Sequence, residues 1–306
     1  MDQNPNIAFY ILTYNRPNIL KVCLETLFTN TNIKYNEAWL IDDGSQPDLK
    51  HGLLDFSIAN STAFPINTLI HGRNYGIGFG FERIYNLMRQ NDDLDIGCII
   101  ESDYVWRKNW LEDVVAVFEA SPLTVAIAGV SHPDMVDKNK THGTFPEIMK
   151  ECFGEDLTAR EHLYKPFDLN TSVGSVKVQG VSNSCGCLMI NWKRFKEVIT
   201  TVDYHYKFNY WKRMDRAFNK GIAHDTRANA SDGHMSSNIT YYGEKYILMQ
   251  GEDISKHFPM LDICDYSISQ HICGGGVNSG RMSEGNTFIL SPNWKDEYIQ
   301  VNPRKI

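Results

Sequence analysis

Short apolar runs alternate with amphipathic stretches over the first 130 residues of the chain. Five apolar runs of strand length predict buried strands at residues 7–12, 38–41, 66–70, 97–100 and 125–130. Three stretches with apolar residues at helical spacing follow the first, third and fourth of these runs, beginning near residues 17, 81 and 109. This alternation predicts an α/β fold with an open, mainly parallel sheet and helices on both of its faces.

The pattern weakens after residue 130. Residues 131–175 favour a loop, which we interpret as a lid, and residues 223–240 are polar and indicate broken structure. Two further strands and two further helices are predicted at residues 176–178, 187–190, 193–200 and 211–220, the last helix stopping at Gly221. We therefore expect two halves of one domain, residues 1–130 and 131–306, the second being a C-terminal elaboration that ends in a loop.

Composition narrows the class of protein. The 306 residues are 42% hydrophobic, which is enough for a sizeable core. With 37 acidic and 30 basic residues, a net charge of −7 and no long basic run, no nucleic-acid partner is expected. The seven cysteines are irregularly spaced without a CxxC pair, which favours reduced thiols. Without a signal peptide or an apolar run of membrane-spanning length, we expect a soluble, cytoplasmic protein with no membrane span.

Polar clusters follow four of the predicted strands. They lie at residues 14–16, 42–45, 73–78 and 101–103. Ligands of parallel α/β sheets bind at the carboxyl ends of the strands. The sequence therefore predicts that all four clusters converge on one edge of the sheet and form a binding site there.

The acidic cluster and residues 42–45 each allow two interpretations when taken alone. The carboxylates of Glu101 and Asp103 suit Mg²⁺ or Mn²⁺, or belong to a solvated loop. Residues 42–45 form either an ordinary turn or a site for a base and ribose hydroxyls. In the Gly-rich stretch 71–80, backbone N–H groups at a helix start favour anions, and Arg73 can pair with a phosphate.

In this order, the clusters resemble those of the inverting family 2 glycosyltransferases, which have a GT-A fold. Residues 13–16 (Thr-Tyr-Asn-Arg) match the end of the family's first strand, and residues 42–45 (Asp-Asp-Gly-Ser) match the end of its second. Residues 73–76 (Arg-Asn-Tyr-Gly) match a segment that opens a helix. Residues 101–103 (Glu-Ser-Asp) stand where the family has its Asp-x-Asp metal motif. The resemblance covers roughly residues 7–120.

The resemblance implies an enzyme of the hexosyl- or pentosyltransferase class. It would transfer a sugar from a nucleotide-sugar donor, with a UDP-sugar favoured, to a hydroxyl of a glycan or glycoconjugate acceptor, with inversion. Residues 1–130 would bind the donor and residues 131–306 the acceptor. Mn²⁺ or Mg²⁺ would assist by neutralising the departing diphosphate.

The resemblance also implies roles for single residues. Tyr14 and Asp42 would contact the base, and Asp43 and Arg73 would line the donor site. The complete set implied for nucleotide-sugar binding is Thr13, Tyr14, Asn15, Arg16, Asp42, Asp43, Arg73, Asn74, Gly76, Glu101 and Ser102. Glu101 could contact either the ribose or the metal, Asp103 would bind the metal, and His271, after a short strand, could complete the metal shell or touch the diphosphate.

The catalytic base is harder to identify. The family usually supplies an Asp from a Glu-Asp pair that opens a helix before a glycine, and no such pair precedes Gly221. Asp215 is the first candidate, Asp253 the second and Asp203 the third. Trp192 and Trp211 belong either to the core or to a surface that stacks on a sugar ring.

The sequence leaves one alternative function open and argues against two others. A non-catalytic module that binds carbohydrate or nucleotide-sugar stays open, because the position of the base is irregular. A nucleotidyltransferase is disfavoured because residues 13–16 lack the glycines that such enzymes carry after the first strand. A dinucleotide-dependent oxidoreductase is excluded because no GxGxxG follows that strand.

Overall fold

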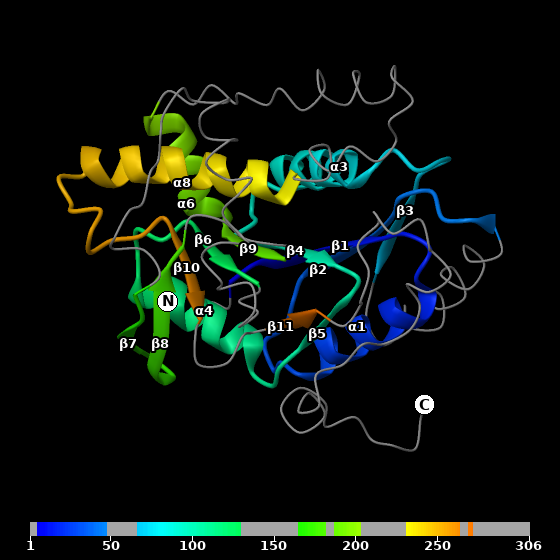
Figure 1. Cartoon of the computed structure of the whole chain (residues 1–306), viewed down its shortest axis with the longest axis horizontal. Helices are drawn as coiled ribbons and strands as arrows, with labels where there is room; N and C mark the ends of the chain where they lie inside the picture. The colour runs from blue at the N-terminus through cyan, green and yellow to red at the C-terminus, as the bar shows by residue number, and fades with distance from the viewer. Residues whose placement is uncertain are drawn as a thin grey trace.

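A nine-stranded sheet forms the centre of the molecule (Figure 1). The computed structural model describes residues 5–47, 66–129, 165–181, 187–202, 231–263 and 269–271. In spatial order the strands of the sheet are β3 (Asn67–Ile70), β2 (Glu37–Asp42), β1 (Ile7–Thr13), β4 (Ile96–Glu101), β9 (Leu188–Asn191), β6 (Ala126–Ala128), β10 (Met260–Ile263), β8 (Gly174–Gly180) and β7 (Phe167–Thr171). A separate antiparallel pair joins β5 (Tyr104–Trp106) to β11 (Ser269–His271).

Most strands of the large sheet run in one direction. The four strands β3, β2, β1 and β4 are parallel to one another. β9 is antiparallel to both β4 and β6, and β8 is antiparallel to both β10 and β7, so these two strands alone are reversed. The sheet therefore has the expected open, mainly parallel character, and the carboxyl ends of β1 to β4 share one edge.

Helices cover both faces of the sheet, as expected (Figure 1). α1 (Pro17–Thr29) and α4 (Trp110–Ala120) lie on one face, while α3 (Ile77–Gln90), α6 (Trp192–Thr201) and α8 (Ser231–Met249) lie on the other. Alternate residues of β1 serve the two cores, with Phe9 among the first and Tyr10 among the second. Each core thus holds one layer of helices against the sheet.

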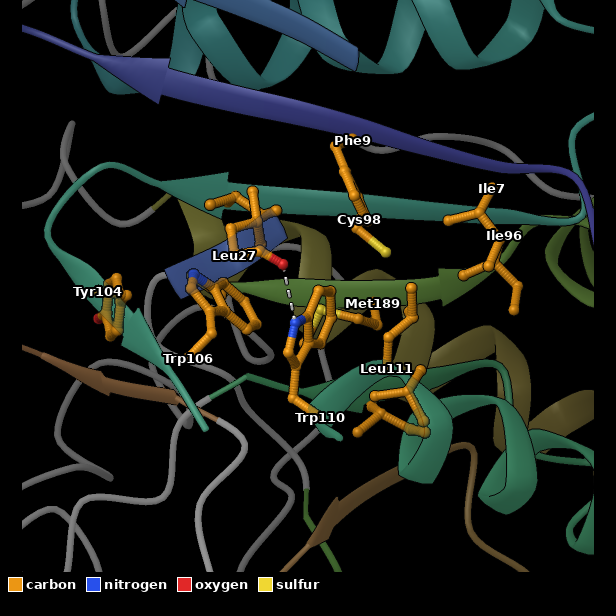
Figure 2. Close-up of a cluster of buried hydrophobic side chains, with 14 of the residues drawn as sticks. Ile7, Phe9, Leu27, Ile96, Cys98, Tyr104, Trp106, Trp110, Leu111 and Met189 are labelled. Atoms are coloured by element: carbon orange, nitrogen blue, oxygen red, sulfur yellow. Dashed lines mark hydrogen bonds between the residues drawn. The ribbon is translucent and has the colours of Figure 1, made fainter. Parts of the chain in front are cut away.

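Trp106, Trp110 and Trp192 belong to these cores. Figure 2 shows Trp106 and Trp110 close together under the sheet, with the Trp110 indole N–H donating to the carbonyl oxygen of Leu27 at 3.2 Å. Trp192 is 1% exposed in the opposite core and packs against Phe195. The idea that Trp192 stacks on a sugar ring is therefore wrong, because its ring is buried. Trp211 lies outside the described residues.

Two expected irregular segments are ordered elements. β7 lies inside the stretch 131–175 that we expected to be a loop, and it forms a hairpin with β8, which contains the strand predicted at 176–178. Apolar Phe167, Leu169 and Val176 of this hairpin pack against a core. α3 begins at Ile77, inside the Gly-rich stretch. Gly80 lets this helix lie close to β1, because a Cβ there would lie 2.5 Å from the Leu12 side chain. Residues 131–164 and the helix expected at 211–220 lie outside the described residues.

α8 contradicts the expectation of broken structure at residues 223–240 over its first half. Met235, Ile239, Tyr242 and Tyr246 are buried and recur at intervals of four, three and four residues. They belong to the core that α3 and α6 also line. Many residues of this helix have only intermediate helix propensity. They form a helix because tertiary packing of the apolar side supplies most of the stability of a helix in a protein.

Among the described cysteines, Cys23, Cys98 and Cys187 are buried and form no disulfide. Across the ranges that the structure describes, no helix combines the length and apolar character needed to cross a bilayer.

Candidate functional site

The strand register brings the polar clusters to one edge of the sheet. Thr13 lies opposite Asp42, Asp42 lies opposite Ile70, and Leu12 lies opposite Glu101. Main-chain hydrogen bonds continue this pairing past the strand ends, from the Asp43 N–H to the Thr13 carbonyl at 2.9 Å and from the Ser102 N–H to the Leu12 carbonyl at 3.0 Å. The expected convergence of the clusters therefore exists in the fold.

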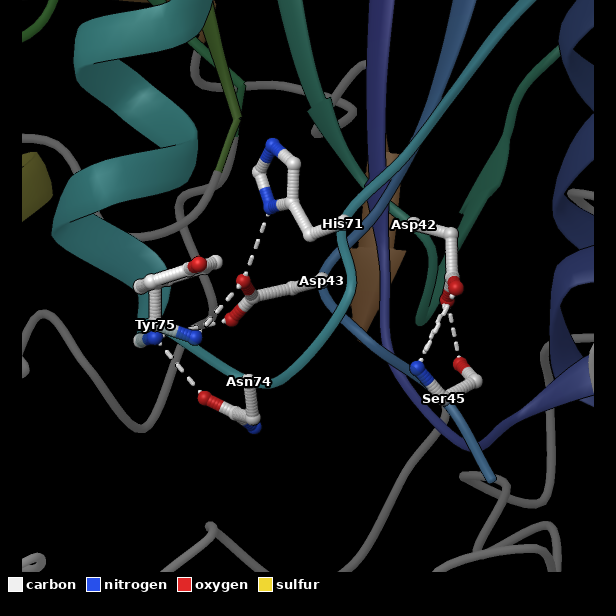
Figure 3. Close-up of polar contacts among 7 residues, drawn as sticks. Asp42, Asp43, Ser45, His71, Asn74 and Tyr75 are labelled. Carbon is white, nitrogen blue, oxygen red and sulfur yellow. Dashed lines mark hydrogen bonds and ion pairs between the residues drawn. The ribbon is translucent and has the colours of Figure 1, made fainter. Parts of the chain in front are cut away.

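Asp42 and Asp43 point to opposite faces of the sheet (Figure 3). Consecutive residues of an extended strand alternate in this way. The Asp42 carboxylate accepts hydrogen bonds from the Ser45 N–H at 3.1 Å and from the Ser45 hydroxyl, which closes the turn after β2. Asp42 is 1% exposed in this arrangement.

The Asp43 carboxylate faces the start of α3. Its Oδ1 atom lies 3.1 Å from His71 Nδ1 and accepts the Tyr75 N–H at 3.1 Å, while Oδ2 accepts the Gly76 N–H at 2.9 Å. Burial raises the pKa of Asp43, and the hydrogen bonds from His71, Tyr75 and Gly76 oppose that rise. Backbone N–H groups that the sequence suggested for an external anion are thus bonded to a carboxylate of the protein itself.

Glycine at position 44 lets the two loops meet. Gly44 has φ +76°, and a Cβ there would lie 2.0 Å from the backbone carbon of Arg73. Arg73 and Asn74 are exposed at this crossing, with the Arg73 guanidinium 4.8 Å from the centre of the Tyr75 ring. The loop therefore presents the Arg73 guanidinium and the Asn74 amide at the sheet edge. Gly76, with φ +89°, is the residue just before α3.

The loop after β1 is joined to the loop after β2. Asn15 has φ +52°; its N–H donates to the Ser45 hydroxyl oxygen at 2.9 Å, and its Oδ1 accepts the Gln46 N–H at 2.8 Å. Thr13 is buried beside Asp42, and Tyr14 is half-buried. Residues of the first two clusters thus form one connected wall.

The acidic cluster lies at the end of β4. Glu101 is half-buried, while Ser102 and Asp103 are 4% and 7% exposed in the turn before β5. Asp103 Oδ2 forms an ion pair with Arg16 Nη1 from the first cluster. Pairing of β11 with β5 places His271 opposite Tyr104, next in sequence to Asp103; the side chain of His271 lies outside the described residues.

These residues fit a divalent cation. Mg²⁺ in nucleotide enzymes is usually bound by one or two carboxylates together with phosphate oxygens. Asp103 and Glu101 meet that requirement at one strand end, although the described side chains contain no group of three or more His, Cys, Asp or Glu gathered as metal ligands. Asp103 is paired with Arg16, so a divalent cation that binds Asp103 would have to share this carboxylate with the guanidinium or displace it.

Asp253 is far from this edge. It is exposed in the turn between α8 and β10, where its carboxylate accepts the Ser255 N–H at 2.8 Å. β10 runs in the same direction as β1, so the residues before it lie at the amino ends of the strands. The expectation that Asp253 joins the other site residues is therefore wrong. Asp203 and Asp215 lie outside the described residues.

The sequence analysis did not predict the start of α8. The helix opens at Ser231-Asp232 and ends two residues before Gly251. Near its other end, the Tyr246 hydroxyl lies 3.1 Å from Arg194 Nη1, in the first turn of α6, and α6 begins at the amino edge of the sheet. Figure 1 shows that α8 runs from the side of α3 toward the turn before β10. The first turn of α8, which holds Ser231 and Asp232, therefore lies at the end of the helix away from that amino edge. The spacing of residues 235, 239, 242 and 246 was the signal for this helix in the sequence.

Comparisons with known proteins were made for sequence and structure. The model of the family described as Glycosyl transferase family 2 matches residues 9–189. Among curated proteins, none matches the chain.

Three solved structures illustrate the structural matches. The mannosyltransferase PcManGT from Pyrobaculum calidifontis, in complex with GDP-Man and Mn²⁺, is 12% identical with a TM-score of 0.41, covering 65% of this chain and 47% of that one. GalNAc-T7 with UDP, GalNAc and Mn²⁺ is 12% identical with a TM-score of 0.42, covering 65% and 37%. S. aureus TarS 1-349 in complex with UDP is 16% identical with a TM-score of 0.34, covering 40% and 34%. The matched part spans less than half the length of each of these three chains.

Proposed function

The chain belongs to glycosyl transferase family 2, and we propose that it transfers a sugar from a nucleotide-sugar donor to a hydroxyl of a glycan or glycoconjugate with inversion. The observation that carries this proposal is the family match over residues 9–189, which spans all four polar clusters at the carboxyl edge. A UDP-sugar is the first donor to test, because UDP is the common nucleotide in this family. A hexosyl or pentosyl unit would be transferred.

The donor would lie across the ends of β1 to β4. Tyr14 is the residue for the base, and Asp42, which is 1% exposed, would shape this part of the wall through its hydrogen bonds to Ser45. Arg73 and Asn74 are exposed beside that wall, where a guanidinium can pair with a phosphate. Arg16 adds a second positive charge beside Asp103.

Asp103, with Glu101 and His271, would hold Mn²⁺ or Mg²⁺. A bound divalent cation neutralises the negative charge of a departing nucleoside diphosphate. The protein's own part is to hold Asp103, which is 7% exposed and ion-paired, and the backbone of Glu101, whose N–H lies 3.4 Å from Cys187 Sγ.

Inversion needs a general base for the acceptor hydroxyl, and we propose Asp232 for this role. Two observations support it: Asp232 is the second residue of α8, which ends shortly before a glycine, and that helix starts on the side of α3, away from the turn before β10. In the family the base is likewise an Asp that opens a helix before a glycine. Ser231 stands where the family has Glu, so the match rests on position and on the Asp alone.

The proposed function is tested by a thermal-shift screen of the whole chain against UDP, GDP, CDP and dTDP, with and without Mn²⁺. A Mn²⁺-dependent rise in Tm with one nucleotide is expected, because a ligand that binds only the native state stabilises it by mass action. We expect Asp103→Asn to abolish the Mn²⁺-dependent part of that rise.

A matched control uses the second Arg–Asp ion pair. Asp113, on α4, pairs with Arg107, which precedes the helix. Both side chains are 16% exposed, similar to those of Arg16 and Asp103. Asp113→Asn should keep the full nucleotide response. Absence of any shift with the wild-type chain would overturn the proposed function, and an unchanged response in Asp103→Asn would overturn the metal assignment. Nucleotide binding without sugar transfer would instead favour a non-catalytic binding module.

A further inference from the structure

We propose that Asp43 and His71 are positioning residues, which hold Arg73 and Asn74 at the donor site without contacting the donor themselves. This inference rests on the proposed function, since it assigns to Arg73 and Asn74 the contact with the donor's diphosphate. It also changes the role of Asp43, which the family resemblance would place among the residues that line the donor site.

The Asp43 carboxylate already has three protein partners. Both oxygens accept hydrogen bonds, from the Tyr75 and Gly76 N–H groups and from the His71 ring, and Asp43 is 4% exposed (Figure 3). These backbone N–H groups lie at the start of α3, the end of a helix that attracts negative charge. Asp43 therefore supplies, from inside the protein, the anion that this helix start favours.

His71 fixes the other side of the carboxylate. The His71 ring is held edge-on by Tyr75 and Phe79, with ring centres 5.8 Å and 5.0 Å away. The backbone N–H of His71 donates to the Asp42 carbonyl at 2.9 Å. Its side chain is 6% exposed. Because Nδ1 meets a carboxylate oxygen, the Nδ1–H form of the ring is the one that makes this hydrogen bond.

The two residues act on the segment between them and α3. Asn74 Oδ1 accepts the Gly76 N–H at 2.7 Å, and the Gly44 backbone crosses Arg73 at close range. Arg73 and Asn74 are thus the exposed tip of a loop whose two ends are fixed by Asp43 and His71. A phosphate contact made by a long Arg side chain depends on such fixation, because a loose loop would have to be ordered on binding.

The test measures the Kd of the nucleoside diphosphate that gives the largest Mn²⁺-dependent shift with the wild-type chain. His71→Leu fills the space beside Phe79 with an apolar side chain but removes the hydrogen-bond donor to Asp43. We expect the Kd to rise by about tenfold, the loss typical of a buried hydrogen bond to a charged group. His71→Asn places an amide N–H near the position of Nδ1 and should restore most of the affinity.

A double-mutant cycle separates positioning from direct contact. If His71 acts through Arg73, His71→Leu should have little further effect on Kd in an Arg73→Ala background. Additive losses would show direct contact with the nucleotide and overturn the inference, as would a wild-type Kd in His71→Leu. Should His71→Leu fail to fold by circular dichroism, the comparison of His71→Asn with His71→Gln replaces it, because Gln carries its amide one atom further out; equal Kd values would then contradict the proposal. A wild-type chain that binds no nucleotide would instead defeat the proposed function.

Discussion

At the scale of single residues, neighbours in sequence have different tasks at the site. Asp42 closes the turn after β2 with Ser45, while Asp43 caps the start of α3. The letters Asp-Asp-Gly-Ser alone could not separate these tasks, because either carboxylate can close a turn or contact a ligand. The separation follows from strand alternation, and the positive φ of Gly44 turns the chain after Asp43 so that Ser45 reaches back to Asp42.

Gly44→Ala tests this residue-scale packing, with Gly251→Ala as a matched control. The two glycines have φ +76° and +79°, but a Cβ meets the Arg73 backbone at 2.0 Å in one case and nothing within 4 Å in the other. Both changes carry the strain of a left-handed residue, about 1–2 kcal/mol. Gly44→Ala should lose about 1–3 kcal/mol more, from overpacking. Urea denaturation measures the difference, and equal losses would contradict the close approach of the two loops.

At the scale of elements, periodic apolar runs were enough to predict β1, β2, β4, α1 and α4, whereas α8 was misread. Its buried side includes tyrosines, and polar residues such as Ser236, Thr240 and Glu244 are buried as well. A helix that is buried on several sides lacks the simple division into apolar and polar faces. Its identity as a helix therefore depends on the elements around it, above all α3 and α6.

Ile239→Ala should destabilise the protein if α8 is a packed helix. Ile239 is 1% exposed, and truncation of a buried Ile typically costs about 2–5 kcal/mol. Leu248→Ala, in the same helix at 56% exposure, should change the free energy of unfolding by less than about 0.5 kcal/mol. Denaturant unfolding of both variants measures this contrast. Similar small effects at the two positions would show that residues near 239 are not part of the core.

At the scale of the whole molecule, strand order and direction bring distant segments to one edge. β11 pairs with β5, so His271 lies beside the turn that holds Asp103, more than 160 positions away in the sequence. α8 runs from the side of α3 toward the turn before β10 (Figure 1), so its first residues and the turn that follows its last ones lie at opposite ends of the helix. Asp232 and Asp253, both near ends of this helical segment, are separated in this way.

Asp232→Asn should lower kcat by about 10²–10⁴, the typical contribution of general acid–base catalysis. The Mn²⁺-dependent nucleotide shift should persist, because the donor residues are unchanged. Asp253→Asn is the control, since Asp253 lies at the opposite edge, and its kcat should equal that of the wild type. The measurement is release of nucleoside diphosphate from the nucleotide-sugar class found in the screen. A wild-type kcat in Asp232→Asn would refute the assignment of the base.

The sequence by itself determined the α/β alternation, the first four strands and the polar clusters that follow them. These features are local: hydrophobic periodicity reflects which side of an element is buried, and turn residues mark where a strand stops. Tertiary structure alone decided which carboxylate faces α3, that Trp192 is buried, and that Asp253 lies at the wrong edge. Each of these depends on contacts between segments far apart in the chain, whose positions follow from strand order and helix packing and leave no local pattern in the sequence.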